Sequence, residues 1–319
     1  MDLIDKKIIC ALDENCRKPI SQLAHELRIS RSIASYRIKN LEEKGIISKY
    51  ICSISLGLLG YKTYKIYFKV QTSAENQERE FINFLVNNNH VIHCLKTEGS
   101  FDYSAVVAVK NVLELDNFIS EIKTRFTNIL KDYAITIVVY TKIYKLNKLL
   151  LKHKERSLKI DKYSGEENYQ DIDEKDKKII HILSQKSNIS ILEIAEKTNL
   201  SIDVVKYRLK KLTGTIINSF RAIFNLNKLG YYHYVLLLKM RQATKKDEEN
   251  LLAWCASKEN VLYSTKRIGY FDFEINAAIT DINDLNDFLS EFKKKFPNII
   301  DSYELIINSQ LLKLNYVPF

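Results

Sequence analysis

The sequence is poor in the residues and runs that mark several classes of protein. It has five cysteines with no CxxC pair, and only three prolines and eight glycines in 319 residues. The odd, scattered cysteines argue against a disulfide-stapled secreted domain and indicate reduced thiols, most of them in the core. The longest apolar runs, such as AITIVVY at 134–140, are far shorter than the roughly 20 residues that a membrane helix needs. The N-terminus, MDLIDKK, lacks an apolar signal core, so we expect a cytoplasmic protein without a membrane partner.

Motifs for nucleotide binding and for common hydrolytic sites are also missing. The sequence has no GxxxxGK[ST] phosphate loop, no GxGxxG, no GxSxG elbow and no HExxH zinc motif. Its six histidines form no recognisable cluster with carboxylates along the chain. We therefore predict no catalytic residues, no metal site and no cofactor, and a protein that is not an enzyme.

The charge is strongly basic and unevenly distributed. Lysine and arginine number 49 against 39 acidic residues, which gives a net charge of +10. Residues 1–160 hold 26 basic and 17 acidic side chains, and residues 161–319 hold 23 and 22. Nearly all of the excess therefore lies in the first half, where it favours a polyanionic partner such as nucleic acid.

Two long stretches of the sequence repeat each other in the same order. DKKIICAL at 5–12 returns as DKKIIHIL at 176–183, and GSFDY at 99–103 returns as GYFDF at 269–273. The copies are far apart and collinear, so we infer a duplication of one unit of about 150 residues. The polar segment 152–174 between them has no sustained apolar period and is predicted to be a linker.

Each unit shows the same succession of expected elements. Helical periods at 3–13 and 20–27 precede a third helix that Ser30 caps and Gly45 ends, and a β-prone segment follows, as in a winged helix-turn-helix. The remainder reads βαββαβ, the ferredoxin-like order. Strands are expected near 61–70, 91–98, 102–109 and 132–143 and helices near 76–88 and 112–127, and the second unit repeats them.

The predicted fold class is therefore α+β, as a tandem duplication of these two domains. The predicted domains are a winged helix at 1–58, a βαββαβ domain at 59–150, a linker at 151–173, a second winged helix at 174–228 and a second βαββαβ domain at 229–319.

The third helix of the first unit carries the clearest functional signal. Ala34, Ile38 and Leu41 recur at helical spacing and should face the core. The opposite face presents Arg31, Ser32, Ser35, Tyr36 and Lys39. Arginine and serine at the start of such a helix are suited to base edges in the major groove of double-stranded DNA. Three further cations are expected to neutralise phosphates, namely Arg37, Lys44 and Lys49.

The matching helix of the second unit keeps its core but changes its outer face. Arg31 becomes Ile202, and Ser32 becomes Asp203. The positions that still suit DNA are Lys206, Tyr207, Arg208 and Lys210. An acidic group repels nearby phosphates, so we predict that the first helix dominates DNA affinity.

These features together resemble the Lrp/AsnC group, the leucine-responsive or feast/famine transcription regulators of bacteria and archaea. The resemblance rests on DKKI, the block ISQLAHELRISRSIASYRIKNLEEKGII, the LGY step and the G-x-F-D-Y turn. It implies βαββαβ sensing domains that pair through their sheets and bind small, amino acid-like effectors. Members normally carry one unit per chain, so the fused pair resembles a covalent pseudo-dimer, which could assemble into a larger homo-oligomer.

The resemblance also places the effector at the turn between two strands of each sensing domain. The residues concerned are Gly99, Ser100, Phe101 and Asp102, and in the second unit Gly269, Tyr270, Phe271 and Asp272. The alternative is a tight turn whose Phe101 and Phe271 belong to the core.

Two other classes of function stay open at this stage. The chain also resembles the siroheme decarboxylases, relatives of these regulators that pair two unlike copies of the same two-domain unit. Such an enzyme would need histidines near a tetrapyrrole. The candidates are His90, His93 and His233. The second alternative is a sensor or adaptor without DNA binding, against which the basic charge argues.

Overall fold

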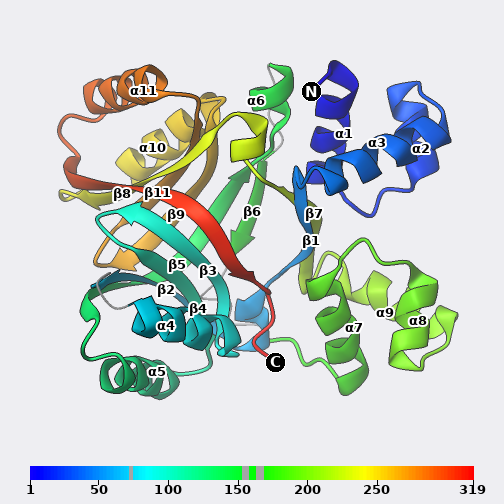
Figure 1. The fold of residues 1–319 in the computed structure, drawn as a ribbon, viewed down its shortest axis with the longest axis horizontal. Coiled ribbons are helices and arrows are strands. Elements are labelled where there is room, and N and C mark those ends of the chain that lie inside the picture. The colour runs from blue at the N-terminus through cyan, green and yellow to red at the C-terminus, as the bar shows by residue number, and fades with distance from the viewer. Residues whose placement is uncertain (72–74, 153–157, 163–168) are drawn as a thin grey trace.

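The chain forms two helical heads beside a barrel of β-strands (Figure 1). The computed structural model describes residues 1–71, 75–152 and 169–319, and the backbone of 158–162. No helix among these residues has the length and apolar character needed to cross a membrane.

Each head is a three-helix unit followed by one strand. The first head consists of α1 (Leu3–Glu14), α2 (Ile20–Leu27), α3 (Arg31–Glu43) and β1 (Ile47–Ile54). The second head consists of α7 (Glu174–Gln185), α8 (Ile191–Thr198), α9 (Ile202–Leu212) and β7 (Ile217–Phe224). Ser30 caps α3 as predicted, and Gly45 follows its end with a φ of +64°.

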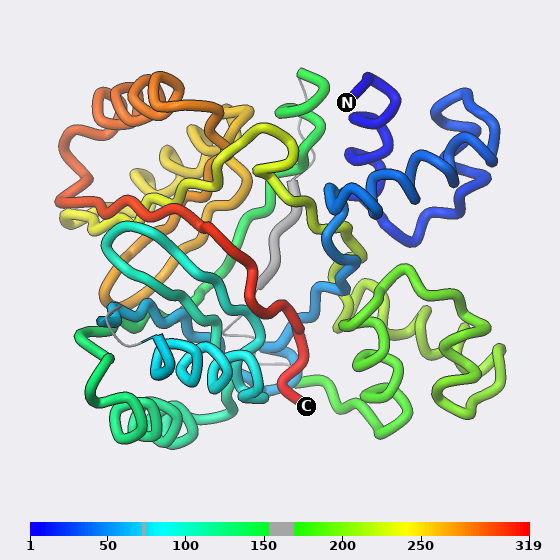
Figure 2. Tube along the Cα trace, viewed as in Figure 1, coloured from blue at the N-terminus to red at the C-terminus, as the bar shows by residue number. Residues whose placement is uncertain are grey.

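The two heads are joined by a ladder between β1 and β7. These strands pair antiparallel from Ile47 opposite Phe224 to Ile54 opposite Ile217. Helix α1 packs on β7 and helix α7 packs on β1, so each head rests on the strand of the other. Arg17 Nη1 also donates to the carbonyl oxygens of Ser187 at 2.6 Å and Ile189 at 2.8 Å. The heads are therefore held in one fixed relation, beside the barrel (Figure 2).

Both βαββαβ domains contribute strands to a single barrel. The first domain supplies β2 (Lys62–Val70), β3 (Val91–Gly99), β4 (Tyr103–Val109) and β5 (Leu130–Tyr144). The second supplies β8 (Tyr232–Met240), β9 (Val261–Gly269), β10 (Phe273–Ile279) and β11 (Ile300–Leu314). The strands follow in the order β2-β4-β3-β11-β8-β10-β9-β5, and β5 also pairs with β2. The long strands β5 and β11 each bend from their own domain onto the other one, which closes the barrel.

Helices cover the outside of the barrel in two layers. The covering helices are α4 (Glu75–Asn87) and α5 (Val112–Arg125) on the first domain, and α10 (Lys245–Ser257) and α11 (Ile282–Lys295) on the second. Aromatic rings fill the interfaces, such as Phe81 against Phe126 and Trp254 against Phe292. Strand and helix bounds agree with the sequence-based expectation to within a few residues.

Four short elements were not expected from the sequence. They are α6 (Asn147–Leu151), β6 (Leu158–Lys162), and the 3-10 turns η1 (Leu56–Leu59) and η2 (Asn227–Leu229). Helix α6 packs on α1, and β6 pairs antiparallel with the end of β5. The predicted linker thus contains a strand. This strand forms because its backbone pairs with the free edge of β5, and the composition of the segment does not indicate it. The linker residues 153–157 and 163–168 lie outside the described residues.

Candidate nucleic-acid interface and central cavity

Helix α3 presents a polar face to solvent at its N-terminus. Ser30 Oγ accepts from the Ile33 amide at 3.2 Å, which starts the helix and satisfies one of its free donors. Ala34 and Leu41 are buried in the head. The four residues predicted to read bases are all exposed, namely Arg31, Ser32, Ser35 and Tyr36. The helix therefore keeps open the face that the sequence assigned to DNA.

The predicted phosphate contacts divide into two groups. Lys39 and Lys44 are exposed beside the open face. Arg37 instead pairs with Asp2 at 2.7 Å and Asp5 at 2.8 Å, and these bonds raise its pKa. Lys49 donates to the carbonyl of Leu314 at the end of β11, and burial lowers its pKa. In the free protein, the cationic groups of Arg37 and Lys49 therefore hold the head together and hold it to the barrel, and their phosphate contacts stay a prediction.

Helix α9 of the second head is equally exposed but carries different chemistry. Lys206, Tyr207 and Lys210 are open to solvent, and Lys206 lies 3.6 Å from Asp203. Ile202 is 40% exposed where α3 has Arg31. Arg208 repeats the role of Arg37, since its guanidinium pairs with Asp173 at 2.7 Å and Asp176 at 2.8 Å. Its DNA contact likewise stays a prediction.

The two turns predicted to bind an effector lie at one end of the barrel and have structural roles there. Gly99 has a φ of +121° and Gly269 one of +125°, and each lies against the backbone of the opposite domain. Phe101 and Phe271 are buried against Tyr67, with ring centroids 5.4 and 5.6 Å from it. These rings belong to the core, which is the alternative considered for the turns.

The acidic residues of the two turns accept hydrogen bonds from backbone amides, and the remaining polar residues face solvent. Asp102 accepts from the Val70 amide and Asp272 from the Met240 amide, both at 2.8 Å. Ser100 and Tyr270 are exposed. The described residues that line the central cavity do not include any from these two turns.

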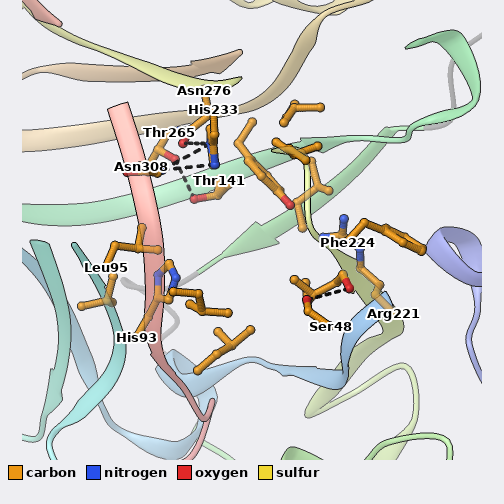
Figure 3. A pocket seen from close by; sticks show the side chains of 18 of the residues that line it. Ser48, His93, Leu95, Thr141, Arg221, Phe224, His233, Thr265, Asn276 and Asn308 are labelled. Carbon is orange, nitrogen blue, oxygen red and sulfur yellow. Dashed lines mark hydrogen bonds between the residues drawn. The ribbon is translucent and has the colours of Figure 1, made fainter. Parts of the chain in front are cut away.

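A central cavity of about 610 Å³ lies between the barrel and the β1–β7 ladder. Its volume falls within the roughly 300–1,000 Å³ of small-molecule sites. Asp13 at the end of α1, Ser48 of β1 and Arg221 of β7 form one side, and strands of both barrel halves form most of the remainder. Figure 3 shows Arg221, Ser48 and Phe224 on one side of this space and His93 and His233 on the other.

Buried ion pairs extend from the cavity into the barrel. Glu274 lies 3.0 Å from Lys65 Nζ and 2.6 Å from Arg267 Nη2. It also accepts from Tyr67 and, at 2.9 Å, from Asn276 Nδ2. Although burial alone would raise its pKa, the two cations hold the pKa of Glu274 well below its ordinary value.

Two histidines that are 140 positions apart in the sequence both line this cavity. His233 Nε2 lies 2.9 Å from Asn276 Oδ1, and Asn308 Nδ2 also contacts the ring (Figure 3). Burial lowers the pKa of His93 to about 3 and that of His233 to about 4, so both are neutral at pH 7. His90 does not line the cavity.

Sequence reasoning identified these histidines but missed the charged residues around them. Lys65, Arg267 and Glu274 lie on strands, where a single charge resembles an ordinary outward-facing position. Comparison of the two copies could have found them, because each charged residue aligns with an uncharged one in the other unit. The matching residues are Val235, Thr97 and Ser104.

Two family models match separate stretches of the chain. Residues 1–48 and 172–213 match the winged helix-turn-helix DNA-binding family, and residues 65–142 match the Lrp/AsnC ligand-binding domain. An HTH-type transcriptional regulator of Methanocaldococcus jannaschii is 31% identical over 124 residues, which are 38% of this chain and 80% of that protein. The regulator FL11 of Pyrococcus furiosus is 30% identical over 120 residues, covering 37% of this chain and 78% of its own.

One group of solved structures matches the whole tandem arrangement. The siroheme decarboxylase NirDL aligns over 99% of this chain and 94% of its own, with a TM-score of 0.64 and 18% identity. Its complex with an iron-uroporphyrin III analogue aligns with a TM-score of 0.65 and 17% identity. At this level of identity, the likeness establishes the shared fold.

These observations define a tandem winged helix-turn-helix protein with two βαββαβ domains closed into one barrel. The chain belongs to the Lrp/AsnC family, with two copies of the family's unit in one polypeptide. The resemblance and the fold class predicted from the sequence are thereby confirmed.

Proposed function

We propose that the protein is a DNA-binding transcription regulator that reads its operator mainly through the first head. The exposed N-terminal face of α3 carries the proposal, because a capped helix with free arginine and serine side chains fits the major groove. The relatives named as HTH-type transcriptional regulators support the same function.

In this proposal Arg31 reads a guanine edge through paired hydrogen bonds, and Ser32, Ser35 and Tyr36 make neighbouring base or phosphate contacts. Lys39 and Lys44 neutralise phosphates on either side of the helix. The second head contributes weaker or differently specific contacts through Lys206, Tyr207 and Lys210, because Asp203 repels the backbone. The resulting operator has one dominant half-site and lacks twofold symmetry.

Selection of genomic fragments by the purified full chain tests this function. We expect a recovered motif with one well-defined half and one degenerate half. The same selection with Lys206→Ala and Lys210→Ala together should retain the well-defined half. Recovery of random fragments at low salt and of none at physiological salt would show non-specific charge attraction and contradict the proposal.

A second candidate function is decarboxylation of a tetrapyrrole in the central cavity. It is favoured by His93 and His233 lining one cavity together with Arg267, and by the whole-chain likeness in fold to NirDL. Loss of carbon dioxide leaves a carbon that must take up a proton. His93 and His233 are neutral in the free protein, so in this candidate a bound anionic substrate would have to raise their pKa before either could donate that proton. Mixing the protein with siroheme and following the Soret band tests this candidate, and an unchanged spectrum rejects it.

A further inference from the structure

The two halves of the chain differ most where they meet in the central cavity. Several of its polar side chains have an apolar or small counterpart in the other copy. Lys65 corresponds to Val235, Asn276 to Val106 and Asn308 to Val138. Arg267 corresponds to Thr97, and Glu274 corresponds to Ser104. A barrel that needed only to be stable could keep the apolar residues in both copies, since buried ion pairs add little to stability.

The charges around the cavity do not balance. Glu274 is shared between two cations, Lys65 and Arg267. Asp13 is likewise shared between Arg221 at 2.9 Å and Lys145 at 3.8 Å, and all three of these side chains are buried. Among the described residues, the Glu274 group therefore has one more positive than negative charge, and the two neutral histidines add none. Burial of uncompensated positive charge is costly unless an anion approaches it.

Polar atoms without partners lie in the same wall. Among the described residues, Arg267 Nε, Thr63 Oγ1 and Asn308 Oδ1 are buried and have no hydrogen-bond partner. All three residues line the cavity and are more than nine-tenths buried. A buried guanidinium with a free N–H is a preformed donor for a carboxylate.

We propose that the central cavity binds a small molecule with two or more carboxylates. One carboxylate lies near Arg267 and Lys65, and another lies near Arg221 across the cavity. This is a different place from the turns at Gly99 and Gly269. Burial lowers the pKa of Lys65, which agrees with a cation that Glu274 alone does not satisfy.

Binding of a ligand in this cavity should change the position of the two heads. The wall is built from α1, from both strands of the β1–β7 ladder and from the barrel, so a ligand bridges the parts that set the position of the heads. This regulatory role rests on the proposed DNA-binding function, whereas the binding site itself does not.

Isothermal titration of the full chain with citrate tests the site. We expect one site per chain, with no binding of triethyl citrate or leucine at the same concentrations. Arg267→Gln should weaken citrate binding at least tenfold, whereas Arg241→Gln, which alters an exposed arginine paired with Asp301, should leave it unchanged. If Arg267→Gln fails to fold, Val106→Phe, which fills the cavity from a half-buried position, should abolish binding instead.

A second titration with uroporphyrin tests whether the carboxylates belong to a small acid such as citrate or to a tetrapyrrole. Binding of uroporphyrin without citrate, again weakened by Arg267→Gln, supports the carboxylate site and identifies a tetrapyrrole as its occupant. No binding of either polycarboxylate, or equal binding of triethyl citrate, overturns the proposal.

A gel shift with the selected operator, with and without citrate, separates the site from the function. Citrate binding with no operator binding under any condition contradicts the regulator function and leaves the cavity site standing. Operator binding that is unchanged by bound citrate contradicts the regulatory role of the site.

Discussion

Arginines of similar sequence context have different roles according to what surrounds them. Arg31 and Arg37 lie within two turns of the same helix. Arg31 is exposed, whereas Arg37 is held by Asp5 of α1 and by Asp2, which caps that helix. The pattern of residues along α3 could place both on its outer side, but only the fold shows that the start of α1 covers one of them.

Replacement of each arginine separates the two roles. Arg31→Ala should leave the melting temperature unchanged, weaken operator binding by about 1–3 kcal/mol and relax specificity at one base pair. Arg37→Ala should lower the melting temperature, because it removes the ion pairs between α3 and α1. Competition gel shifts and thermal melts measure the two effects. Arg79→Ala on the distant helix α4 serves as the charge control. A loss from Arg31→Ala that is equal for all sequences would assign Arg31 to phosphate instead.

The buried histidines make stability depend on pH in a defined direction. Burial, and to a smaller extent the charge of Lys65, lower the pKa of His93, and both imidazoles have a pKa below the value of about 6.5 of an unfolded chain. As the pH falls below about 6.5, the unfolded state takes up protons first. The contribution of the two neutral histidines to the free energy of unfolding is therefore fully present above that pH. It is lost as the pH falls toward 4, at roughly 1 kcal/mol per pH unit for each histidine.

Urea unfolding between pH 7 and pH 5 measures this dependence. His93→Gln and His233→Gln should each reduce the slope of unfolding free energy against pH. His25→Gln changes an exposed histidine of the first head and should leave the slope as it is. An unaltered slope in both cavity variants would show that the two imidazoles are free to protonate in the folded protein.

At the scale of elements, local sequence determines more of the fold than of the site. Helical periods, Ser30 and Gly45 predicted the helices of the first head, and the repeat supplied those of the second. The strand β6 could not be predicted, because its five residues are ordered by the edge of β5. The cavity could not be predicted either, because His93 and His233 come to line one space only after β3 and β8 enter one barrel.

The glycines of the two turns show how closely the strands approach. A side chain at Gly269 would place its Cβ 2.7 Å from the carbonyl oxygen of Ile135, which is backbone and cannot turn aside. Gly269→Ala should therefore destabilise the protein by about 2–4 kcal/mol, through steric overlap added to the strain of a positive φ.

Gly230→Ala is the matched control. Gly230 has a φ of +86° but no atom within 4 Å of an added Cβ, so strain alone of about 1–2 kcal/mol should result. Urea unfolding of both variants compares the two losses. Equal losses would mean that the backbone around Ile135 moves to accommodate the methyl group.

At the scale of the whole molecule, one chain provides both sides of its barrel. The pairs β3–β11 and β5–β9 join the two domains, and β1–β7 joins the heads. The strand edges that face the other domain are thus occupied within the described chain. Folding should consequently not require association with a second molecule.

The midpoint of urea unfolding should therefore be independent of protein concentration. Measurements over a wide range of concentration, with size determination at each end, test this expectation. A midpoint that rises with concentration would indicate that assembly of several chains supports the fold.

The asymmetry at Lys65 and Glu274 has a consequence for the two halves taken separately. Two identical subunits must carry the same residue at equivalent positions. A dimer of two first halves would therefore bury two copies of Lys65, each facing Ser104 instead of a carboxylate. Two second halves would bury glutamates and arginines without a lysine. A free-standing dimer of first halves would thus bury Lys65 without a counter-ion, whereas Glu274 and Arg267 of the second half neutralise each other. We therefore expect the first half to depend on its covalent partner more than the second half does.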